Sequence, residues 1–366
     1  MAASVVPDSK IILELRTPDA RDLPVFLVGN FNGWQVNDDR YRLEKVKKGL
    51  YRFEFPNRLL LPQIVEYKYV RGGWDQVELD SNGNEISNRV FHHGIGFISD
   101  VVPRWRRGTL TYRVDLLPKI RIISESFQIP QLIKTRRIAA LLPHDYDHTN
   151  RRYPVLYLQD GQNLFDDYAP FGSWGVDKKL AELAEKGLGN VIVIAIDHAS
   201  EARIAEFTPS YPTRLGIGEG KKYARFLKET LKPYVDANFR TLPDREHTGI
   251  GGSSMGGLIS IYAGLMFPEV YSKLMIFSPS LWVAPNIHFH SGNLKTSYGT
   301  KIYLYGGGAE SAGMAPSLKR IKETLEQQGQ GSNMDIRLVI DPRGRHNEAR
   351  WGKEFPRAIK WLFFKK

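Results

Sequence analysis

The sequence predicts two domains, a small β-sandwich followed by a larger α/β domain with a mostly parallel sheet. The length predicts the number of domains, because 366 residues suffice for about two domains of ~150 residues each. The first hundred residues contain short alternating segments of strand composition, separated by Gly, Asn, Asp and Pro. From about residue 113, apolar strand-like runs alternate with longer helical stretches, which is typical of βαβ units.

The composition limits the chemistry that the chain can perform. An apolar content of 42% excludes a mainly disordered chain. The absence of cysteine excludes a disulfide scaffold, a thiolate zinc site and a cysteine nucleophile. No stretch approaches ~18 consecutive apolar residues, so we expect no membrane-spanning helix and no membrane partner. Serine, histidine, aspartate and glutamate remain to carry any reactivity.

The formal net charge of +11 favours acidic partners in principle. The basic residues are scattered, however, and the sequence contains no zinc-finger spacing, basic zipper or RNA-binding aromatic signature. We therefore expect no nucleic-acid partner and interpret the charge as a solvated surface that can attract an anionic substrate. The first residues lack the features of a secretory signal peptide, which favours a cytoplasmic protein and leaves open a secreted form whose signal has been removed.

Residues 1–100 are expected to form the β-sandwich. Four segments in this region have the length and alternating composition of strands: Ile11–Leu15, Val25–Val28, Tyr51–Phe55 and Val65–Val70. Short strands at this spacing, followed by turn residues such as Gly72 and Gly73, favour a small β-sandwich. Residues 101–114, which contain a proline and a basic run, are interpreted as the linker to the second domain.

Residues 115–366 are expected to form the α/β domain. Five runs of nearly continuous apolar character predict buried strands: Val155–Leu158, Val191–Ile196, Lys273–Phe277, Ile302–Tyr305 and Ile336–Ile340. Four stretches with apolar residues at helical spacing lie between them: Val176–Lys186, Lys221–Phe239, Gly257–Phe267 and Ser317–Gln328. Strands that are buried on both faces imply a mostly parallel sheet with helices on each side.

The strongest local signal is the segment Gly249–Gly257, within which Gly252–Gly256 fits the pattern G-x-S-x-G. It follows a short strand and precedes an apolar helix, which is the context of a nucleophile elbow. The tight turn requires small residues two positions before and after the serine, and the start of the helix offers free N–H groups to a forming oxyanion. We predict Ser254 as the nucleophile and the Met255 N–H as one oxyanion donor.

A serine nucleophile needs a base and an acid, which in this architecture follow it in the order serine, acid, histidine at the ends of later strands. His346 lies in the loop after the last predicted strand and is predicted to be the base. Glu310 follows the preceding strand and is the first choice for the acid, with Asp341 as the alternative. The loop after an earlier strand is expected to supply the second oxyanion donor, for which the Gln162 N–H is the best choice.

Three motifs in order, Tyr153–Gln162, Gly252–Gly256 and Gly344–Glu348, resemble the putative-esterase family, which contains esterase D, enterochelin esterases and feruloyl or acetylxylan esterases. The resemblance spans about residues 115–366. It implies an α/β-hydrolase fold and ester hydrolysis through an acyl-enzyme, without a metal or another cofactor. The nucleophile and base that it implies are Ser254 and His346. The acid that it implies falls on Glu310, where many relatives have an aspartate.

The first domain resembles a starch- or glycogen-binding immunoglobulin-like module over roughly residues 8–98, on the motifs Val28–Trp34 and Glu66–Tyr69 and the residues that follow them. In such modules exposed tryptophans stack on sugar faces, while a lysine and an asparagine bond the hydroxyl groups. The residues that the resemblance assigns to these roles are Trp34, Lys68, Trp74 and Asn88. The alternative is that the sandwich only shapes the rim of the active site or that Trp34 fills its core.

Substrate-binding residues are expected on loops after strand ends, where Trp174, Arg203 and Trp282 lie. These three side chains could hold an aromatic or an anionic acyl group. The leading hypothesis is a serine carboxylester hydrolase that acts on feruloyl or acetyl esters of carbohydrates. The alternatives are a siderophore esterase of the enterochelin type and, in another class, a non-catalytic glycan-binding protein on a hydrolase scaffold.

Overall fold

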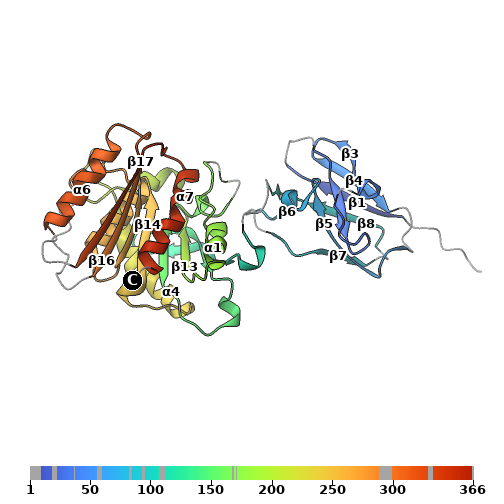
Figure 1. Cartoon of the computed structure of the whole chain (residues 1–366), viewed down its shortest axis with the longest axis horizontal. Helices are drawn as coiled ribbons and strands as arrows, with labels where there is room; N and C mark the ends of the chain where they lie inside the picture. The colour runs from blue at the N-terminus through green and yellow to red at the C-terminus, as the bar shows by residue number, and fades with distance from the viewer. Residues whose placement is uncertain are drawn as a thin grey trace, which may run out of the picture. The chain divides into compact units, whose positions relative to one another are not determined.

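The computed structural model describes residues 10–364, apart from 19–22, 37, 56–59, 82–84, 93–94, 107–111, 167–168, 170, 288–298 and 329–332. The chain divides into two compact units, one composed of Met1–Thr111 and Asp166–Tyr168 and the other of Tyr112–Phe165 and Ala169–Lys366. In Figure 1 the first unit is drawn in blue to cyan and the second from green to red. Each unit has an apolar core of its own.

The first unit is the small β module that the sequence predicts. Its two main sheets have the strand orders β3-β4-β1-β8 and β2-β5-β7. The strands are β1 (Ile11–Arg16), β2 (Phe26–Gly29), β3 (Glu44–Lys47), β4 (Leu50–Phe55), β5 (Ile64–Val70), β7 (Arg89–His92) and β8 (Phe97–Val101). Tyr51, Phe53 and Phe55 point inward at alternate positions of β4 and share one core with Tyr67 of β5, so the two sheets pack face to face.

Part of the segment that was expected to be the linker belongs to this module. Arg104–Trp105 forms a short strand, β9, which pairs with β6 (Glu78–Leu79). The Trp105 side chain is fully buried in the core of the module, and its indole N–H donates to Thr17 Oγ1 at 3.0 Å. Burial of a tryptophan with its N–H satisfied contributes on the order of 2–3 kcal/mol, which holds this segment to the module. The expected boundary at 101 was therefore too early.

The second unit contains a sheet of eight strands in the order β10-β11-β13-β12-β14-β15-β16-β17. The strands are β10 (Lys119–Ile129), β11 (Lys134–Leu142), β12 (Val155–Gln159), β13 (Ile192–Ile196), β14 (Thr248–Ser253), β15 (Lys273–Phe277), β16 (Thr300–Gly307) and β17 (Met334–Asp341). The last six are parallel to one another, which confirms the predicted, mostly parallel sheet. The antiparallel hairpin of β10 and β11, which the sequence analysis did not predict, extends one edge.

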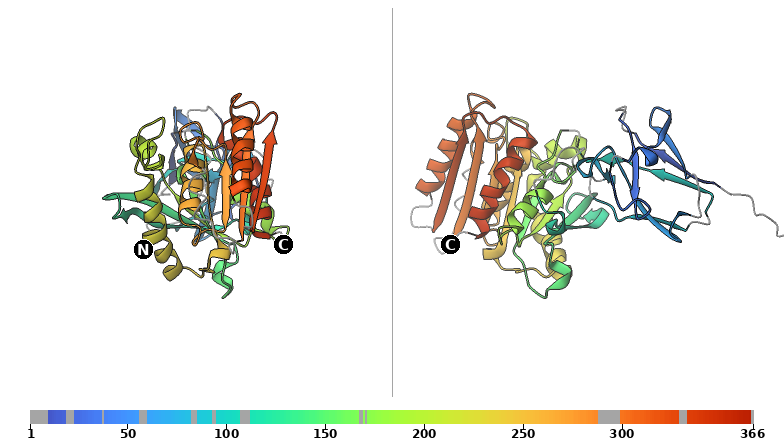
Figure 2. Two further views of the ribbon diagram at one scale, coloured as in Figure 1. Left: turned by 90° about the vertical axis from the view of Figure 1, so that its left-hand side faces the viewer. Right: turned by 45° about the vertical axis from the view of Figure 1, so that its right-hand side comes forward.

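Helices cover both faces of this sheet, as the apolar strands require. They are α1 (Val176–Ala184), α2 (Arg203–Phe207), α3 (Gly220–Phe226), α4 (Lys232–Asn238), α5 (Met255–Met266), α6 (Met314–Gln328) and α7 (Glu348–Ile359). Along β12, Val155 and Tyr157 pack in one buried cluster with residues of α3, α5 and α6, whereas Leu156 and Leu158 pack in another with residues of α1 and α7. Figures 1 and 2 show α6 and α7 on opposite sides of the sheet.

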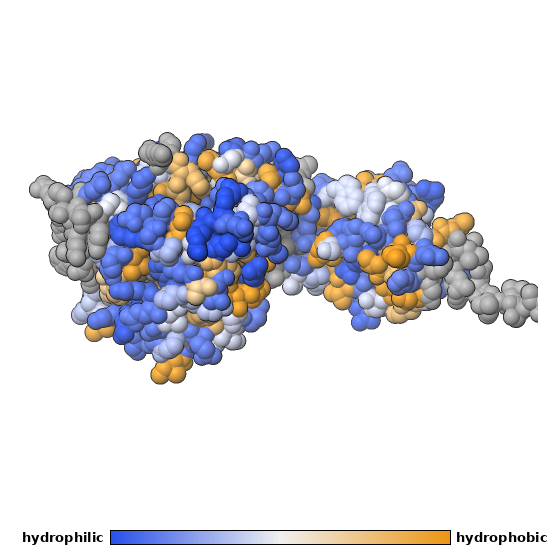
Figure 3. All heavy atoms as spheres, turned by 90° about the horizontal axis from the view of Figure 1, so that it is seen from below, coloured by the Kyte–Doolittle hydropathy of each residue, from blue (hydrophilic) through white to orange (hydrophobic). Residues whose placement is uncertain are grey.

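The face of the molecule drawn in Figure 3 is largely hydrophilic. Polar and charged residues cover most of the face drawn in Figure 3, and apolar residues lie among them in small groups. Among the helices of the described residues, none combines the length and the apolar character needed to cross a membrane.

Candidate active site

Ser254 occupies the sharp turn between β14 and α5, with φ 55° and ψ −123°. This region of backbone conformation is strained for any residue with a side chain, at a cost of roughly 1–3 kcal/mol, and such strain clusters at active sites. The turn tolerates it because the Ser254 N–H donates to the Phe277 carbonyl and the Ser254 carbonyl accepts from Ser280 N–H, both at 3.0 Å. A Cβ atom at Gly256 would lie 2.6 Å from Asp160 Oδ2, so only glycine fits there. The predicted elbow geometry is present.

Glu310 and His346 meet at the carboxyl ends of β16 and β17. His346 Nδ1 lies 2.7 Å from Glu310 Oε2. The two loops dock closely because Gly307 has no side chain: a Cβ atom there would lie 2.3 Å from the Gly344 carbonyl oxygen. Asp341, the alternative acid, instead lies 3.4 Å from Arg350 of α7 and caps its own turn. The structure thus brings Glu310, and not Asp341, to the imidazole.

The Glu310 carboxylate is buried and held at both oxygens, whereas the His346 ring is 41% exposed. Oε1 accepts hydrogen bonds from the Ser278 hydroxyl and from the Gly307 N–H, each at 2.6 Å. The Ser278 hydroxyl in turn accepts from Trp351 Nε1 at 2.9 Å. These hydrogen bonds fix the orientation of the carboxylate, which in turn orients the imidazole ring.

Ser278 is a residue of this site that the sequence analysis missed, and Trp351, which lies just after the motif Gly344–Glu348, was given no role there. Ser278 follows β15 directly and has a positive φ of 41°. The Trp351 ring also packs edge-on against His346, with centroids 4.9 Å apart and planes at 85°. The only local signal for Ser278 is its place after the carboxyl end of a buried strand, which several other loop residues share.

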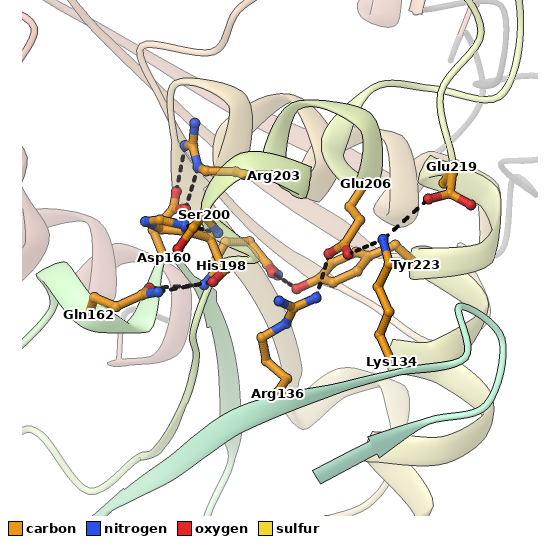
Figure 4. A network of polar contacts seen from close by, with 11 residues as sticks. Lys134, Arg136, Asp160, Gln162, His198, Ser200, Arg203, Glu206, Glu219 and Tyr223 are labelled. Atoms are coloured by element: carbon orange, nitrogen blue, oxygen red, sulfur yellow. Dashed lines mark hydrogen bonds and ion pairs between the residues drawn. The ribbon is translucent and has the colours of Figure 1, made fainter. Parts of the chain in front are cut away.

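The two predicted oxyanion donors lie on two different segments, the start of α5 and the turn after β12. Met255 is the first residue of α5, so its N–H has no acceptor within its own helix. Gln162 lies in the short turn Gly161–Asn163, directly after β12. Its side chain clamps the backbone of His198, donating from Nε2 to the carbonyl at 3.0 Å and accepting from the N–H at 2.9 Å (Figure 4). This clamp fixes the turn that carries the Gln162 N–H.

Ser254 and His346 line a cavity of about 930 Å³ and also an adjoining recess of about 430 Å³. Polar groups dominate the named side chains of the larger cavity, among them Asn163, His198 and Glu348. The recess is more apolar, and its apolar side chains are Ile204, Leu215, Met255, Trp282 and Met314. The nucleophile therefore lines two spaces, of which the recess is the more apolar.

Of the three expected substrate residues, the structure brings two to the cavities. Arg203 lines both spaces and Trp282 lines the recess. Trp174 does not: its side chain is 4% exposed and stacks on Phe277, with centroids 5.3 Å apart and planes at 21°. The expectation for Trp174 was wrong because a loop residue beside a strand end can turn into the layer under α7 rather than toward the substrate.

Burial shifts the pKa values of three groups around the turn at Gly161. It raises the pKa of Glu348 and lowers that of His198, which favours the neutral form of each. Burial also raises the pKa of Asp197 from 3.8 to about 6, and Arg137, 3.6 Å away, offsets part of this effect. Among the described residues, no group of three or more His, Asp or Glu side chains could hold a metal ion.

In the first unit, the structure brings Trp34 and Trp74 together, with ring centroids 6.2 Å apart. Trp74 is 41% exposed, and Trp34 is half-buried against a small apolar cluster. Lys68 and Asn88 are already engaged within the protein, Lys68 with the Ile86 carbonyl and Asn88 with Glu66. The tryptophans thus form a pair, while the two predicted polar contacts are occupied by protein partners.

Comparison with known proteins agrees with this geometry. A family model described as "Putative esterase" matches residues 130–362. The chain is 25% identical over 246 residues to the uncharacterized protein YbbA of Bacillus subtilis (strain 168), which covers 63% of this chain and 93% of that protein. It is 26% identical over 209 residues to the ferri-bacillibactin esterase BesA of the same organism, which covers 50% of this chain and 70% of BesA.

Two further matches concern the fold and a shorter segment. The solved structure of the enterobactin esterase FES from Shigella flexneri, in the presence of 2,3-dihydroxy-N-benzoyl-serine, has a TM-score of 0.53 at 16% identity and covers 97% of this chain and 93% of that chain. An alpha-amylase of Niallia circulans is 35% identical over 85 residues, which covers 23% of this chain and 6% of that enzyme. Because the esterase model matches well over half of the sequence, the chain belongs to the Putative esterase family of α/β-hydrolases and is a carboxylic ester hydrolase.

Proposed function

We propose that Ser254, His346 and Glu310 form the catalytic triad of this ester hydrolase. The observation that carries the proposal is the 2.7 Å contact between Glu310 and His346, whose imidazole lines the same cavity as the strained Ser254. A serine hydroxyl is a weak nucleophile, and a base that is itself oriented by a carboxylate activates it.

The reaction then proceeds by acyl transfer. His346 takes the proton of Ser254 while the hydroxyl oxygen attacks the ester carbonyl, and the backbone N–H groups of Met255 and Gln162 hold the oxyanion. His346 gives the proton to the leaving alcohol, and an acyl group remains on Ser254. Water, deprotonated by His346, attacks this acyl-enzyme and releases the carboxylic acid.

The test of the triad is hydrolysis of p-nitrophenyl acetate by Ser254→Ala. We expect a loss of about 10⁴-fold or more, because triad members act as a unit. Ser126→Ala serves as a matched control, since Ser126 is an exposed residue of β10. Labelling by a fluorophosphonate should add one adduct to the wild type and to the control, on Ser254, and none to Ser254→Ala. Full activity of Ser254→Ala would refute the proposal.

We propose as substrate an ester that joins an aromatic acyl group to a polar, hydroxyl-rich alcohol, such as a feruloyl ester of a carbohydrate. The apolar recess with the 55% exposed Trp282 supports an aromatic acyl group on one side of Ser254. The larger cavity, which Ser254 also lines, offers Asn163, His198 and Glu348 as hydrogen-bonding partners to an alcohol with several hydroxyl groups. A simple acetyl ester fits the same arrangement, with the recess only partly filled.

The match to BesA and the net charge of +11 favour a second candidate, a catecholate siderophore ester. Both candidates carry aromatic rings, so the alcohol and the charge distinguish them. Hydrolysis of methyl ferulate, compared with that of a ferric trilactone catecholate, separates the two. Turnover of ferulate alone would support the carbohydrate ester, and turnover of the trilactone alone would support the siderophore. Because the chain is an ester hydrolase, the alternative of a non-catalytic protein is not retained.

We further propose that the first unit binds glycan on the pair Trp34 and Trp74. The exposure of Trp74 and the closeness of its ring to that of Trp34 support this proposal. Titration with maltoheptaose should show binding that Trp74→Ala abolishes and that Trp282→Ala, an exposed tryptophan of the other unit, leaves unchanged. Equal binding by Trp74→Ala and wild type would refute it.

A further inference from the structure

Arg203 was expected to contact substrate, but its guanidinium is committed to a carboxylate. Arg203 Nε lies 2.6 Å from Asp160 Oδ1, and a terminal guanidinium nitrogen lies 2.8 Å from Oδ2 (Figure 4). The Asp160 side chain is 8% exposed and that of Arg203 is 21% exposed. A two-bond pair of this kind fixes the orientation of both planes. Arg203 is therefore a poor candidate for binding an anionic acyl group.

Asp160 lies between the two proposed oxyanion donors. Asp160 follows β12 directly and has a left-handed backbone conformation, with φ 59° and ψ 49°. Gln162 lies two residues further along the chain. The Asp160 Oδ2 atom also lies close to Gly256, the residue directly after Met255, since a Cβ atom added to Gly256 would lie 2.6 Å from it. One side chain thus contacts both segments that present N–H groups to the oxyanion.

A negative charge on Asp160 would disfavour the transition state unless the Arg203 guanidinium compensated it. A buried, unpaired carboxylate beside a forming oxyanion would repel it, and the repulsion is strong where water is excluded. The guanidinium compensates this charge at the carboxylate itself. It also satisfies both oxygens, which holds the left-handed turn at Asp160 in place.

The helix that carries Arg203 is anchored independently of substrate. Glu206, one turn later on α2, is fully buried and accepts from Arg136 at 2.6 Å and from Lys134 at 3.0 Å, both on β11 (Figure 4). The Arg203 guanidinium also lies over the Phe207 ring, 5.3 Å from its centroid. The position of Arg203 is therefore set by the protein before any ester binds.

We propose that Arg203 is a positioning residue of the oxyanion site, which neutralises Asp160 and holds the turn that presents the Gln162 N–H. The inference rests on the proposed triad and its oxyanion donors. It assigns Arg203 a role in the transition state rather than in the binding of the ground-state substrate. Loss of Arg203 should then lower kcat and leave KM nearly unchanged.

The test compares Arg203→Met with the double variant Arg203→Met/Asp160→Asn on p-nitrophenyl acetate. We expect Arg203→Met to lower kcat on the order of 10²-fold, as the loss of one oxyanion donor does, with KM within about threefold of wild type. The double variant, which removes the uncompensated charge, should recover at least about tenfold. Inhibition by a trifluoromethyl ketone, which forms a tetrahedral oxyanion on serine, should weaken in parallel with kcat.

The outcomes separate this inference from alternatives. A rise in KM with kcat unchanged would make Arg203 a substrate-binding residue, and a double variant no more active than Arg203→Met would exclude the charge argument; either result overturns the inference. If Arg203→Met fails to fold, Arg203→Lys replaces it, with kcat expected to fall about tenfold and KM to stay near wild type. Ser254→Ala is measured alongside: full activity there refutes the triad, whereas a normal kcat in a folded Arg203 variant refutes only the role of Arg203.

Discussion

The Ser278 hydroxyl donates to Glu310 Oε1 at 2.6 Å, and this contact links the acid of the proposed triad to the loop after β15. The same hydroxyl accepts from the Trp351 indole, whose ring packs against His346. Trp351 therefore supports both members of the acid–base pair, the carboxylate through Ser278 and the imidazole by direct contact. The proposed proton relay is held by neighbours as well as by its own three residues.

We predict that Ser278→Ala lowers kcat about tenfold with KM unchanged. The variant removes one charge-assisted hydrogen bond to Glu310, and such bonds contribute on the order of 1.5–3 kcal/mol. Trp351→Phe keeps the ring against His346 but removes the donor to Ser278, so its loss of kcat should be smaller. Steady-state kinetics on p-nitrophenyl butyrate measure both effects, and a wild-type kcat for Ser278→Ala would show that the contact has no catalytic consequence.

The acid can be assigned by a pair of matched substitutions. Glu310→Gln should lower kcat by roughly 10³–10⁴-fold, because an amide can favour the wrong imidazole tautomer and leaves the imidazolium uncompensated. Asp341→Asn should change kcat less than about threefold, since Asp341 contacts Arg350 and not His346. Both are measured at pH 8. The assignment of Glu310 fails if Asp341→Asn is the more damaging of the two.

The raised pKa of Asp197 predicts that the free energy of unfolding depends on pH. Its pKa in the folded protein is about 6, above the value of 3.8 for an exposed aspartate, so the folded state binds the proton more tightly than the unfolded state. Its contribution to folding is therefore most favourable below pH 4 and is lost as the pH rises through about 6. The full difference is on the order of 3 kcal/mol at most.

Asp197→Asn should remove this dependence. Relative to wild type, the variant should gain about 1–3 kcal/mol of unfolding free energy between pH 4.5 and pH 8. Urea denaturation at the two pH values measures the difference. A gain of the opposite sign would mean that the nearby Arg137 holds the carboxylate ionised.

Gly256 should tolerate no side chain. In Gly256→Ala the new Cβ atom would lie 2.6 Å from Asp160 Oδ2, which must move and disturb the turn that carries Gln162. We expect a loss of activity of at least about 10²-fold and a lower melting temperature. Gly313→Ala is the matched control, because a Cβ atom there meets no atom within 4 Å. Equal activity of the two variants would contradict the close approach of Asp160 to the elbow.

Local pattern predicted much of the fold and part of the site. The apolar runs in β12, β13, β15 and β16 are recognisable because both faces of a parallel sheet are buried. The run in β17 was also expected to be a buried strand, but β17 lies at the edge of the sheet and its apolar side chains are only partly buried. The elbow at Ser254 is recognisable because its glycines are a local steric requirement. The order of nucleophile, acid and base follows from where parallel strands end. By contrast, Trp105 lies in a stretch of basic residues, and nothing local shows that its ring is buried.

The sequence by itself determined the two-part architecture, the serine elbow and the chain positions at which a base and an acid had to be sought. Only the tertiary structure placed Glu310 rather than Asp341 beside His346, packed Trp174 into the core and paired Arg203 with Asp160. The reason is physical: periodicity and turn chemistry act over a few residues, whereas these choices depend on how loops tens of residues apart pack against one another. The close approach of Gly307 to Gly344 brings Glu310 to His346, and no pattern within either loop predicts that approach.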